Sequence, residues 1–181
     1  MKLDEVTKWT PFVYEGKTYD LSHLDAHKIT YTHSAQGKAD IIYEFWVTYS
    51  FHCFAKDYPK QCPVEQESLM YSAPKDKRPF CFIRYELSHN YMKNIIHNLG
   101  SPQIKVTHAG HSSYAAQKVI DSDGSELWYY VPFKVYKYQK KFRIHVTSAY
   151  LVGDEPGGGK VRFSTIAHCL KAGKKLPKPH K

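Results

Sequence analysis

The sequence predicts an α+β fold in which a curved, mostly antiparallel sheet carries one principal helix. Alternating apolar and polar residues recur in many short segments separated by turn signals, which is typical of antiparallel strands. Apolar residues recur at helical spacing in only one convincing segment of the body, between Ser88 and Gly100. Many strands with one good helix favour the α+β class, and a β-barrel-like sheet with a capping helix is the alternative.

The length and composition of the chain predict one domain with a real core. The chain has 181 residues, of which 42% are apolar, and a chain of this size can bury a substantial apolar core. We assign residues 1–170 to a single α+β domain. Residues 171–181, which end in GKKLPKPHK, are expected to form a basic flexible tail.

The first third of the chain is predicted to form strands. The segment PFVYEGKTYDLS predicts a hairpin that turns at Glu15 and Gly16, and residues 28–33 alternate as a strand does. Residues 40–54 form the clearest strand, whose expected core face is Ile41, Tyr43, Phe45, Val47, Tyr49, Phe51 and Cys53. Its opposite face, which includes Glu44 and Trp46, is mixed, so it either faces a ligand or is covered by a helix.

The middle of the chain holds the predicted helix. Residues 56–79 are polar and predict a loop with a short strand near residues 68–71, and residues 80–87 predict a strand. Ser88 is expected to cap the helix and Gly100 to stop it. The apolar face of this helix is Tyr91, Met92, Ile95, Ile96 and Leu99.

The last third predicts further strands. Residues 103–108 and 114–121 are expected strands, and SDGS at 122–125 is a turn. Residues 126–152 predict a long hairpin. DEPGGGK is a break, after which residues 161–170 form either a strand or a short helix.

The charge of the chain points to a polyanionic partner. Lys and Arg total 26 against 17 Asp and Glu, a formal net charge of +9, which favours nucleic acid. The hairpin at 126–152 carries both cations for phosphate and tyrosines for bases, so RNA is the first expectation. The cations are Lys134, Lys137, Lys140, Lys141 and Arg143, and the tyrosines are Tyr129, Tyr130, Tyr136, Tyr138 and Tyr150.

We expect no metal, no cofactor and no membrane span. The four cysteines match no paired Cys-x-x-Cys pattern, and a zinc set of His52 with Cys53, Cys62 and Cys81 is only weakly indicated. Cys53 is better explained as a buried thiol. The chain opens without an apolar run and has no window of membrane length, so the cytoplasm with reduced thiols is the expected location.

A few polar residues inside apolar strands are the candidate catalytic groups: His52, Arg84, Ser148 and Tyr150. RNA cleavage without metal needs a base, an acid and cations around the phosphorane. We expect His52 to act as acid or base, Arg84 and Lys141 to neutralise the phosphate, and Tyr150 to position it. Each also has a structural explanation: a strand end for His52, an ion pair for Arg84, a backbone contact for Ser148 and the core for Tyr150.

Other catalytic templates are absent from the sequence. It contains no GxSxG, GxxxxGK[ST] or HExxH motif, and no GxGxxG that opens a helix. Nucleophile-elbow serine hydrolase, P-loop, zinc-protease and dinucleotide-binding chemistry are therefore not indicated.

Three segments carry a family resemblance: VTYSFHCF at 47–54, RYELSHNYMKNIIHNL at 84–99, and residues 131–152, which end in a strand containing VTSAY. Together they resemble small phage- and plasmid-associated bacterial proteins, sometimes labelled heat shock protein C or stationary-phase adaptation protein. The closing hairpin resembles the barnase/EndoU/RelE-like ribonuclease superfamily, many of whose members are toxins or prophage effectors. This resemblance implies a ribonuclease-like α+β fold with a site formed by His52, Arg84, Ser88, Ser148 and Tyr150.

The leading expectation is therefore a metal-independent endoribonuclease, either a toxin or a phage-defence effector, that leaves a 2′,3′-cyclic phosphate. Its partners would be RNA and an inhibitor (antitoxin) protein. The alternative is a non-catalytic RNA- or protein-binding module of the same fold. A zinc-bearing adaptor that uses the cysteines is a third hypothesis.

Overall fold

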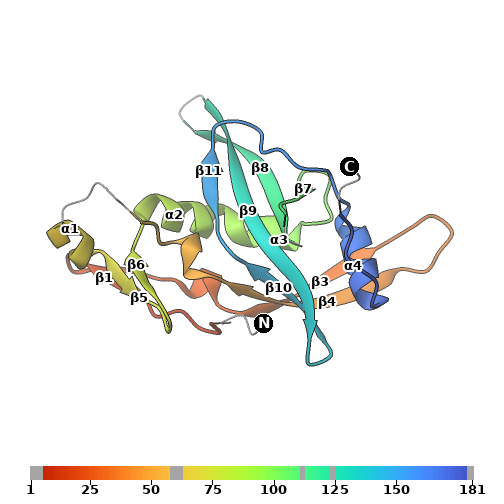
Figure 1. The fold of residues 1–181 in the computed structure, drawn as a ribbon, viewed down its shortest axis with the longest axis horizontal. Coiled ribbons are helices and arrows are strands. Elements are labelled where there is room, and N and C mark those ends of the chain that lie inside the picture. Colours follow the sequence, from red (N-terminus) through yellow and green to blue (C-terminus); the bar gives the residue numbers. More distant parts are fainter. Residues whose placement is uncertain (1–5, 58–62, 111–112, 123–124, 179–181) are drawn as a thin grey trace.

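A computed structural model describes residues 6–57, 63–110, 113–122 and 125–178. It confirms the α+β class: a seven-stranded, curled sheet carries one principal helix (Figure 1). Along the sheet the strand order is β3-β4-β10-β9-β8-β7, and β11 also pairs with β9. The bounds are His27–His33 (β3), Ile41–Tyr49 (β4), Lys105–His108 (β7), Tyr114–Ser122 (β8), Ser125–Tyr138 (β9), Lys141–Val146 (β10) and Tyr150–Val152 (β11).

One strand pair of the sheet is parallel and joins distant parts of the chain. β10 pairs with β4 in parallel, with Arg143 opposite Trp46, whereas the other pairs are antiparallel. β10 and β11 follow one another along the same edge of β9, since β8 occupies the other edge. This arrangement places the long hairpin in the middle of the sheet.

The predicted long hairpin is confirmed, and its turn explains why it is tight. β9 and β10 are joined by Gln139 and Lys140, which both have positive φ, 47° and 62°. Two residues in this region form the type I′ geometry that matches the twist of paired strands. The N-terminal hairpin, β1 (Phe12–Tyr14) and β2 (Lys17–Tyr19), turns in the same way at Glu15 and Gly16.

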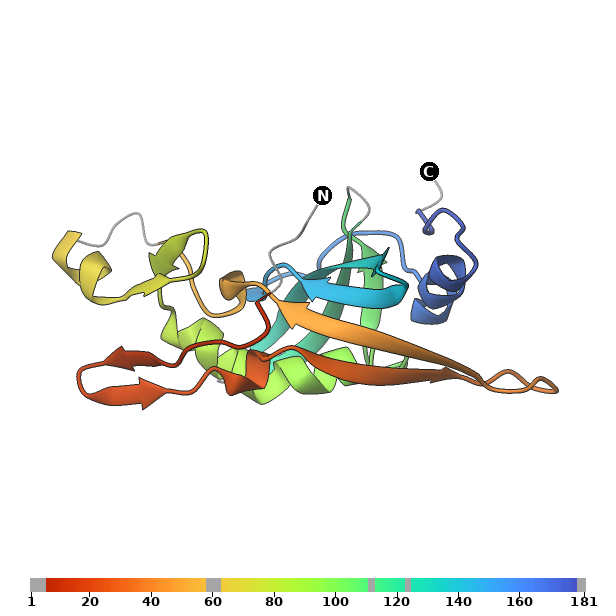
Figure 2. The same ribbon diagram turned by 90° about the horizontal axis from the view of Figure 1, so that it is seen from below.

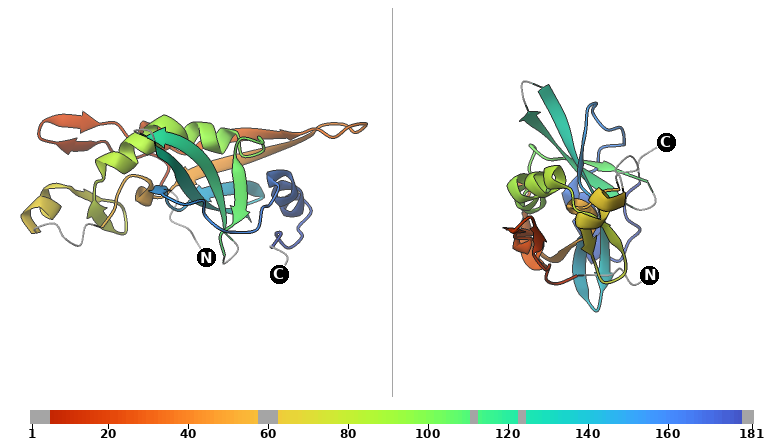
Figure 3. Two further views of the ribbon diagram at one scale, coloured as in Figure 1. Left: turned by 90° about the horizontal axis from the view of Figure 1, so that it is seen from above. Right: turned by 90° about the vertical axis from the view of Figure 1, so that its left-hand side faces the viewer.

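The principal helix is longer than predicted, because it begins before Ser88. It runs through α2 (Phe82–Leu87), a π-helical turn labelled η3 (Ser88–Met92) and α3 (Lys93–His97). Met92, Ile95 and Ile96 are buried, as expected. α3 contacts both β3 and β8, which stand far apart in the strand order, so the sheet curls around this helix (Figure 3).

The prediction of a strand at residues 80–87 is therefore wrong. The aromatic and β-branched residues of FCFIRYEL favour a strand locally, but exposed residues recur at Ile83, Glu86 and His89 with half-buried or buried ones between, which is helical spacing. Ser88 is consequently not a helix cap; it is buried in the middle of the helix, within η3.

Two other segments differ from expectation. The strand predicted at 40–54 ends at Tyr49, and the 3₁₀ turn η2 (Phe51–Cys53) follows, although the core face up to Tyr49 is confirmed. The loop predicted at 56–79 contains α1 (Pro63–Ser68) and a hairpin of β5 (Met70–Ser72) and β6 (Lys77–Pro79). Residues 58–62 and the tip of the SDGS turn lie outside the described residues.

The two ends of the elongated molecule have different contents. Figure 2 shows the β1–β2 hairpin and α1 at one end and the tip of the β3–β4 hairpin at the other. The first end is held by stacked and edge-on rings, among them Phe12 on Phe80 at 4.3 Å and Trp9 against Phe54 at 5.1 Å between centroids. Such ring pairs add to the hydrophobic stabilisation of the core.

The last helix, α4 (Phe163–Lys171), confirms the helical alternative for residues 161–170. It packs Phe163 against Phe45 on the inner side of the sheet, at 5.5 Å between centroids. Beyond it, Leu176 packs on the core and Tyr114 donates its hydroxyl to the carbonyl oxygen of Pro177 at 2.8 Å. Within the described residues, no helix has the length and apolarity that crossing a bilayer requires.

Candidate nucleic-acid interface

A row of basic and aromatic side chains crosses the outer face of the sheet. Lys28 of β3 stands opposite Trp46 of β4, Trp46 opposite Arg143 of β10, and Arg143 opposite Tyr136 of β9. Directly opposed residues of a sheet project to the same side. The inner side is the one that the helices cover, since Phe45 and Tyr129 there contact rings of α4 and the principal helix.

We call this surface the outer face and define it by Lys28, Trp46, Lys134, Tyr136, Tyr138, Lys141 and Arg143. Alternation in β9 places Lys134, Tyr136 and Tyr138 on it, because the intervening residues Phe133 and Val135 are buried. Tyr138 is 42% exposed. Trp46 and Arg143 are half-buried, and Lys28 and Lys141 are exposed.

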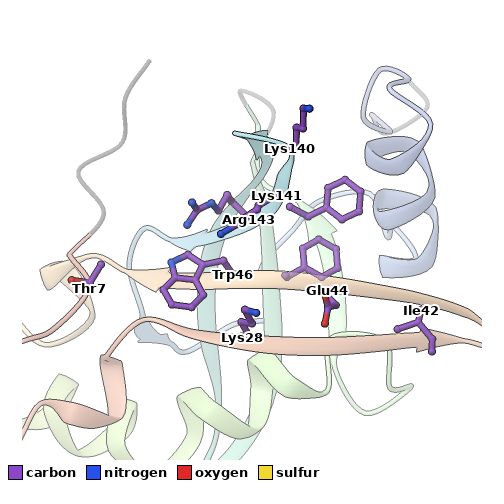
Figure 4. A pocket seen from close by; sticks show the side chains of 10 residues that line it. Thr7, Lys28, Ile42, Glu44, Trp46, Lys140, Lys141 and Arg143 are labelled. Carbon is purple, nitrogen blue, oxygen red and sulfur yellow. The ribbon is translucent and has the colours of Figure 1, made fainter.

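Arg143 is the centre of this face. Its guanidinium carbon lies 5.9 Å from the ring centroid of Trp46 and 5.9 Å from that of Tyr138. Figure 4 shows the end of the Arg143 side chain beside the Trp46 ring, with Lys28 on the neighbouring strand. Cation–π contacts of this kind keep both ring and guanidinium in place.

A groove of about 570 Å³ lies over this part of the sheet. Four cations line it, Lys28, Lys140, Lys141 and Arg143, and one carboxylate, Glu44. The lining residues also include Trp46, Ile42, Phe45 and Phe142, although the Phe45 ring itself turns to the inner side of the sheet. Its volume suits a small ligand such as one nucleotide, and its charge excess suits an anion.

The structure brings some of the predicted RNA-binding cations together and separates others. Lys134, Lys141 and Arg143 belong to the outer face, and Lys140 occupies the hairpin turn, where its side chain extends away from the sheet (Figure 4). Lys137 lies on the opposite side of the hairpin, with its ammonium 5.9 Å from the Phe142 ring centroid. A period-two strand cannot place Lys134 and Lys137 on one face.

A second group contains three of the four predicted catalytic residues. Nη1 of Arg84 donates to the carbonyl oxygens of His52 and Ala55, each at 2.9 Å, and its guanidinium carbon lies 5.6 Å from the Tyr150 ring centroid. The two carbonyl contacts tie α2 to η2. Arg84 is therefore first a structural residue, with one side of its guanidinium turned to Tyr150.

The imidazole of His52 is half-buried against Phe51, with ring centroids 4.3 Å apart. Burial lowers the pKa of His52, and Arg78 and then Arg84 lower it further. A neutral imidazole at neutral pH can accept a proton. No hydrogen bond among the described residues, however, joins this ring to Arg84 or Tyr150 (it is the His52 carbonyl that Arg84 contacts).

Tyr150 connects this group to the outer face. It stands directly opposite Tyr130 of β9, with ring centroids 5.5 Å apart. Tyr130 lies on the same side of β9 as Lys134 and Tyr136, by alternation. Ser148 is half-buried in the connection between β10 and β11, two residues before Tyr150.

Beneath this group lies a buried, uncharged part of the core. Burial raises the pKa of the Cys53 thiol to about 12 and raises the pKa of Tyr49 and Tyr129 as well. Thiol and phenols therefore stay protonated and cannot serve as nucleophiles or bases here. Cys53 is the buried structural thiol that the sequence predicts.

Two further polar residues, Ser88 and His145, are structural. Ser88 is buried, donates its hydroxyl to the Tyr85 carbonyl oxygen at 2.8 Å and accepts from Nε2 of His23 at 2.8 Å. His145, 5% exposed, lies 2.9 Å from the Thr48 hydroxyl through its Nδ1. Within the described residues, no group of three or more His, Cys, Asp or Glu is arranged to hold a metal.

Sequence reasoning missed Lys28 as a site residue and left Trp46 on a face of unassigned role. Period two does place Trp46 opposite the core face of its strand. The parallel pairing that brings it to Arg143, across 97 residues, has no local signal, because parallel register is set by the whole fold.

The comparison with known proteins decides the relationship. The model of the YjaZ family matches residues 11–171. The chain belongs to the YjaZ family. Protein YjaZ of Escherichia coli (strain K12) is 47% identical over 178 residues, which is 98% of each chain. No solved structure matches.

This membership overturns the resemblance drawn from three short segments. The relationship to phage- and plasmid-associated heat shock protein C-like proteins and to barnase/EndoU/RelE-like ribonucleases is wrong, since the match to the YjaZ family covers most of the chain. Short strand motifs such as VTSAY carry little specificity, because many unrelated strands share their pattern. Ser88 loses its proposed role with it, as it is buried inside the helix.

Proposed function

We propose that this protein binds single-stranded RNA through the outer face of β3, β4, β10 and β9. The observation that carries the proposal is the cross-strand row Lys28–Trp46–Arg143–Tyr136 on a sheet face that the helices leave uncovered. It alternates groups that attract phosphate with rings that stack on bases.

Single strands fit this face better than duplexes do. Rings can stack only on bases whose faces are open, and each stacked base contributes about 1–3 kcal/mol. Trp46 and Tyr138 both keep part of their surface exposed. A duplex hides its base faces and would offer phosphate contacts alone.

Charge supports the same ligand. Lys28, Lys141 and Arg143 surround Trp46, and the chain carries +9 overall. Glu44 opposes an anion at the groove, but the lining holds four cations to this one carboxylate. We therefore expect phosphate to bind on the Arg143 side of Trp46 rather than the Glu44 side.

The experiment is a fluorescence anisotropy titration with a labelled 12-nucleotide single-stranded RNA at fixed salt. Arg143→Gln should weaken binding about tenfold, since a charge-assisted contact contributes about 1.5 kcal/mol. Arg162→Gln is the matched control, because Arg162 is exposed at the start of α4, outside the outer face. An equal loss of RNA affinity in Arg143→Gln and Arg162→Gln, or no RNA binding by the wild type, contradicts the proposal.

A second candidate, a metal-independent endoribonuclease, is favoured by one observation: Arg84 lies between the His52 carbonyl and the Tyr150 ring. His52 would move the proton and Arg84 would neutralise the phosphate. The candidate is weaker because both contacts of Nη1 are made to backbone oxygens and the His52 ring has no partner acid among the described residues.

A further inference from the structure

Two histidines from distant parts of the chain meet on the other side of the fold. His27 begins β3 and His97 ends α3, and their Nε2 atoms lie 3.3 Å apart. His97 is exposed and His27 half-buried, so solvent reaches the pair. Seventy residues separate them in sequence.

The tautomer of His27 is set by its surroundings. Its Nδ1 lies 3.0 Å from the backbone carbonyl oxygen of Asp25, which can only accept, so Nδ1 carries the hydrogen. Nε2 of neutral His27 then carries no hydrogen, and its lone pair faces Nε2 of His97. Histidines that bind metal through one nitrogen usually donate the other to a carbonyl or carboxylate in this way.

The distance between the two nitrogens suits a shared ion. Two imidazole nitrogens at about 2.0–2.1 Å from a tetrahedral zinc stand about 3.3–3.4 Å from each other. The Nε2 separation of 3.3 Å is in that range, and it is longer than the usual N–H···O hydrogen bond of about 2.7–3.2 Å.

We propose that His27 and His97 form a binding site for a divalent transition metal of the imidazole-preferring class, such as Zn²⁺ or Ni²⁺. The two Nε2 atoms supply two ligands, and water or a small anion completes the coordination. Bound metal clamps the end of α3 to the start of β3.

One feature favours a cation here and one opposes it. His97 ends a long helix, whose C-terminus attracts positive charge. Lys93 repels a cation, but its long side chain is exposed and its charge is screened by solvent.

The test uses the full chain with all its cysteines and titrates Zn²⁺, and separately Ni²⁺, by calorimetry at pH 7.5. The wild type should bind one ion with a dissociation constant in the micromolar range. His97→Gln and His27→Gln should each weaken that binding at least tenfold, and the double variant should lose less than the product of the two single losses, because both residues bind the same ion. Mg²⁺, which prefers oxygen ligands, should not bind.

Matched controls separate this site from chance binding by other histidines. His33→Gln, on the same strand, and His168→Gln, on α4, should leave the affinity unchanged. Metal at 100 times its dissociation constant should multiply the folding equilibrium constant of the wild type, but not of His97→Gln, by about 100. Unchanged affinity in His97→Gln, additive losses in the double variant, or no binding by the wild type overturns the proposal.

Discussion

His23 and Ser88 are joined across 65 residues by a hydrogen bond of 2.8 Å between Nε2 and Oγ. Ser88 is fully buried in the π-helical turn, and His23 lies in the short helix η1 (Ser22–Leu24). The hydroxyl of Ser88 donates to the Tyr85 carbonyl, so the imidazole must donate to the hydroxyl oxygen. Nδ1 of His23 is then the unprotonated nitrogen, and it is buried without a partner, so protonation would bury a charge and a donor that has no acceptor.

Stability should therefore fall in acid. Burial and then His89 lower the pKa of His23 from 6.5 to about 4. Between these values the unfolded chain binds a proton that the folded chain excludes, so the free energy of unfolding decreases as pH falls from 6.5 to about 4. The binding of one such proton changes the free energy of unfolding by at most about 1.4 kcal/mol per pH unit.

Chemical unfolding of wild type and His23→Gln at pH 7.5, 6, 5 and 4 measures this effect. The variant should lose some stability at pH 7.5 and show a flatter pH dependence. His168→Gln, at an exposed position of α4, should keep the wild-type slope. Parallel curves for wild type and His23→Gln would show that another group is responsible.

Gly158 holds the segment before α4 against β7. Its φ is +127°, and an added Cβ would lie 2.7 Å from the carbonyl oxygen of His108. We predict that Gly158→Ala lowers stability by about 2 kcal/mol, from backbone strain and this contact. Gly157→Ala, where a Cβ would meet nothing within 4 Å, should change it little. Equal melting temperatures for the two variants would contradict the described path of this segment.

Binding without cleavage is the expected behaviour towards RNA. Purified protein incubated with mixed-sequence RNA in EDTA should leave it intact, and His52→Ala should bind as wild type does. Cleavage that persists in EDTA, yields 2′,3′-cyclic phosphate ends and falls at least about 100-fold in His52→Ala would instead establish the nuclease candidate. Loss of activity in an Arg84 variant should be compared with its melting temperature, because Arg84 holds η2 in place and its loss can also destabilise the fold.

The C-terminal lysines should add affinity through charge alone. Lys174 and Lys175 are exposed after α4, and replacing both by Gln should weaken RNA binding and reduce the slope of log affinity against log salt by about 1.4, at about 0.7 per phosphate contact. These substitutions are preferable to truncation, because Leu176 packs on the core. An unchanged slope would mean that these lysines do not touch RNA.

Local pattern predicted the strands well where neighbours in sequence are neighbours in space. Gln139 and Lys140 turn a hairpin whose two strands alternate visibly, and the apolar face of the helix from Met92 to Leu99 follows its spacing. The prediction of a strand around Arg84 is wrong because the aromatic residues of this segment favour strands locally. The segment is helical, and Tyr85 and Ser88 pack against His23 of η1.

Contacts between residues that are far apart in the sequence could not be predicted, because local patterns report only on neighbours along the chain. No periodicity in the sequence indicates that Trp46 lies beside Arg143 or that His27 meets His97. The first depends on the parallel pairing of β4 with β10, and the second on how the sheet curls around the helix. The candidate cations of the hairpin were read from composition, so Lys137 was grouped with residues that the pleat places on the other side.

The most direct test of the outer face replaces Trp46 by Phe and by Leu and measures affinity for single-stranded RNA. The two residues are similar in volume, but only Phe offers a ring for a base. We predict that Trp46→Phe stays within about threefold of wild type and that Trp46→Leu binds at least about tenfold more weakly, as expected from the loss of one stacked base. Equal affinities for Trp46→Leu and wild type would contradict RNA binding at this face.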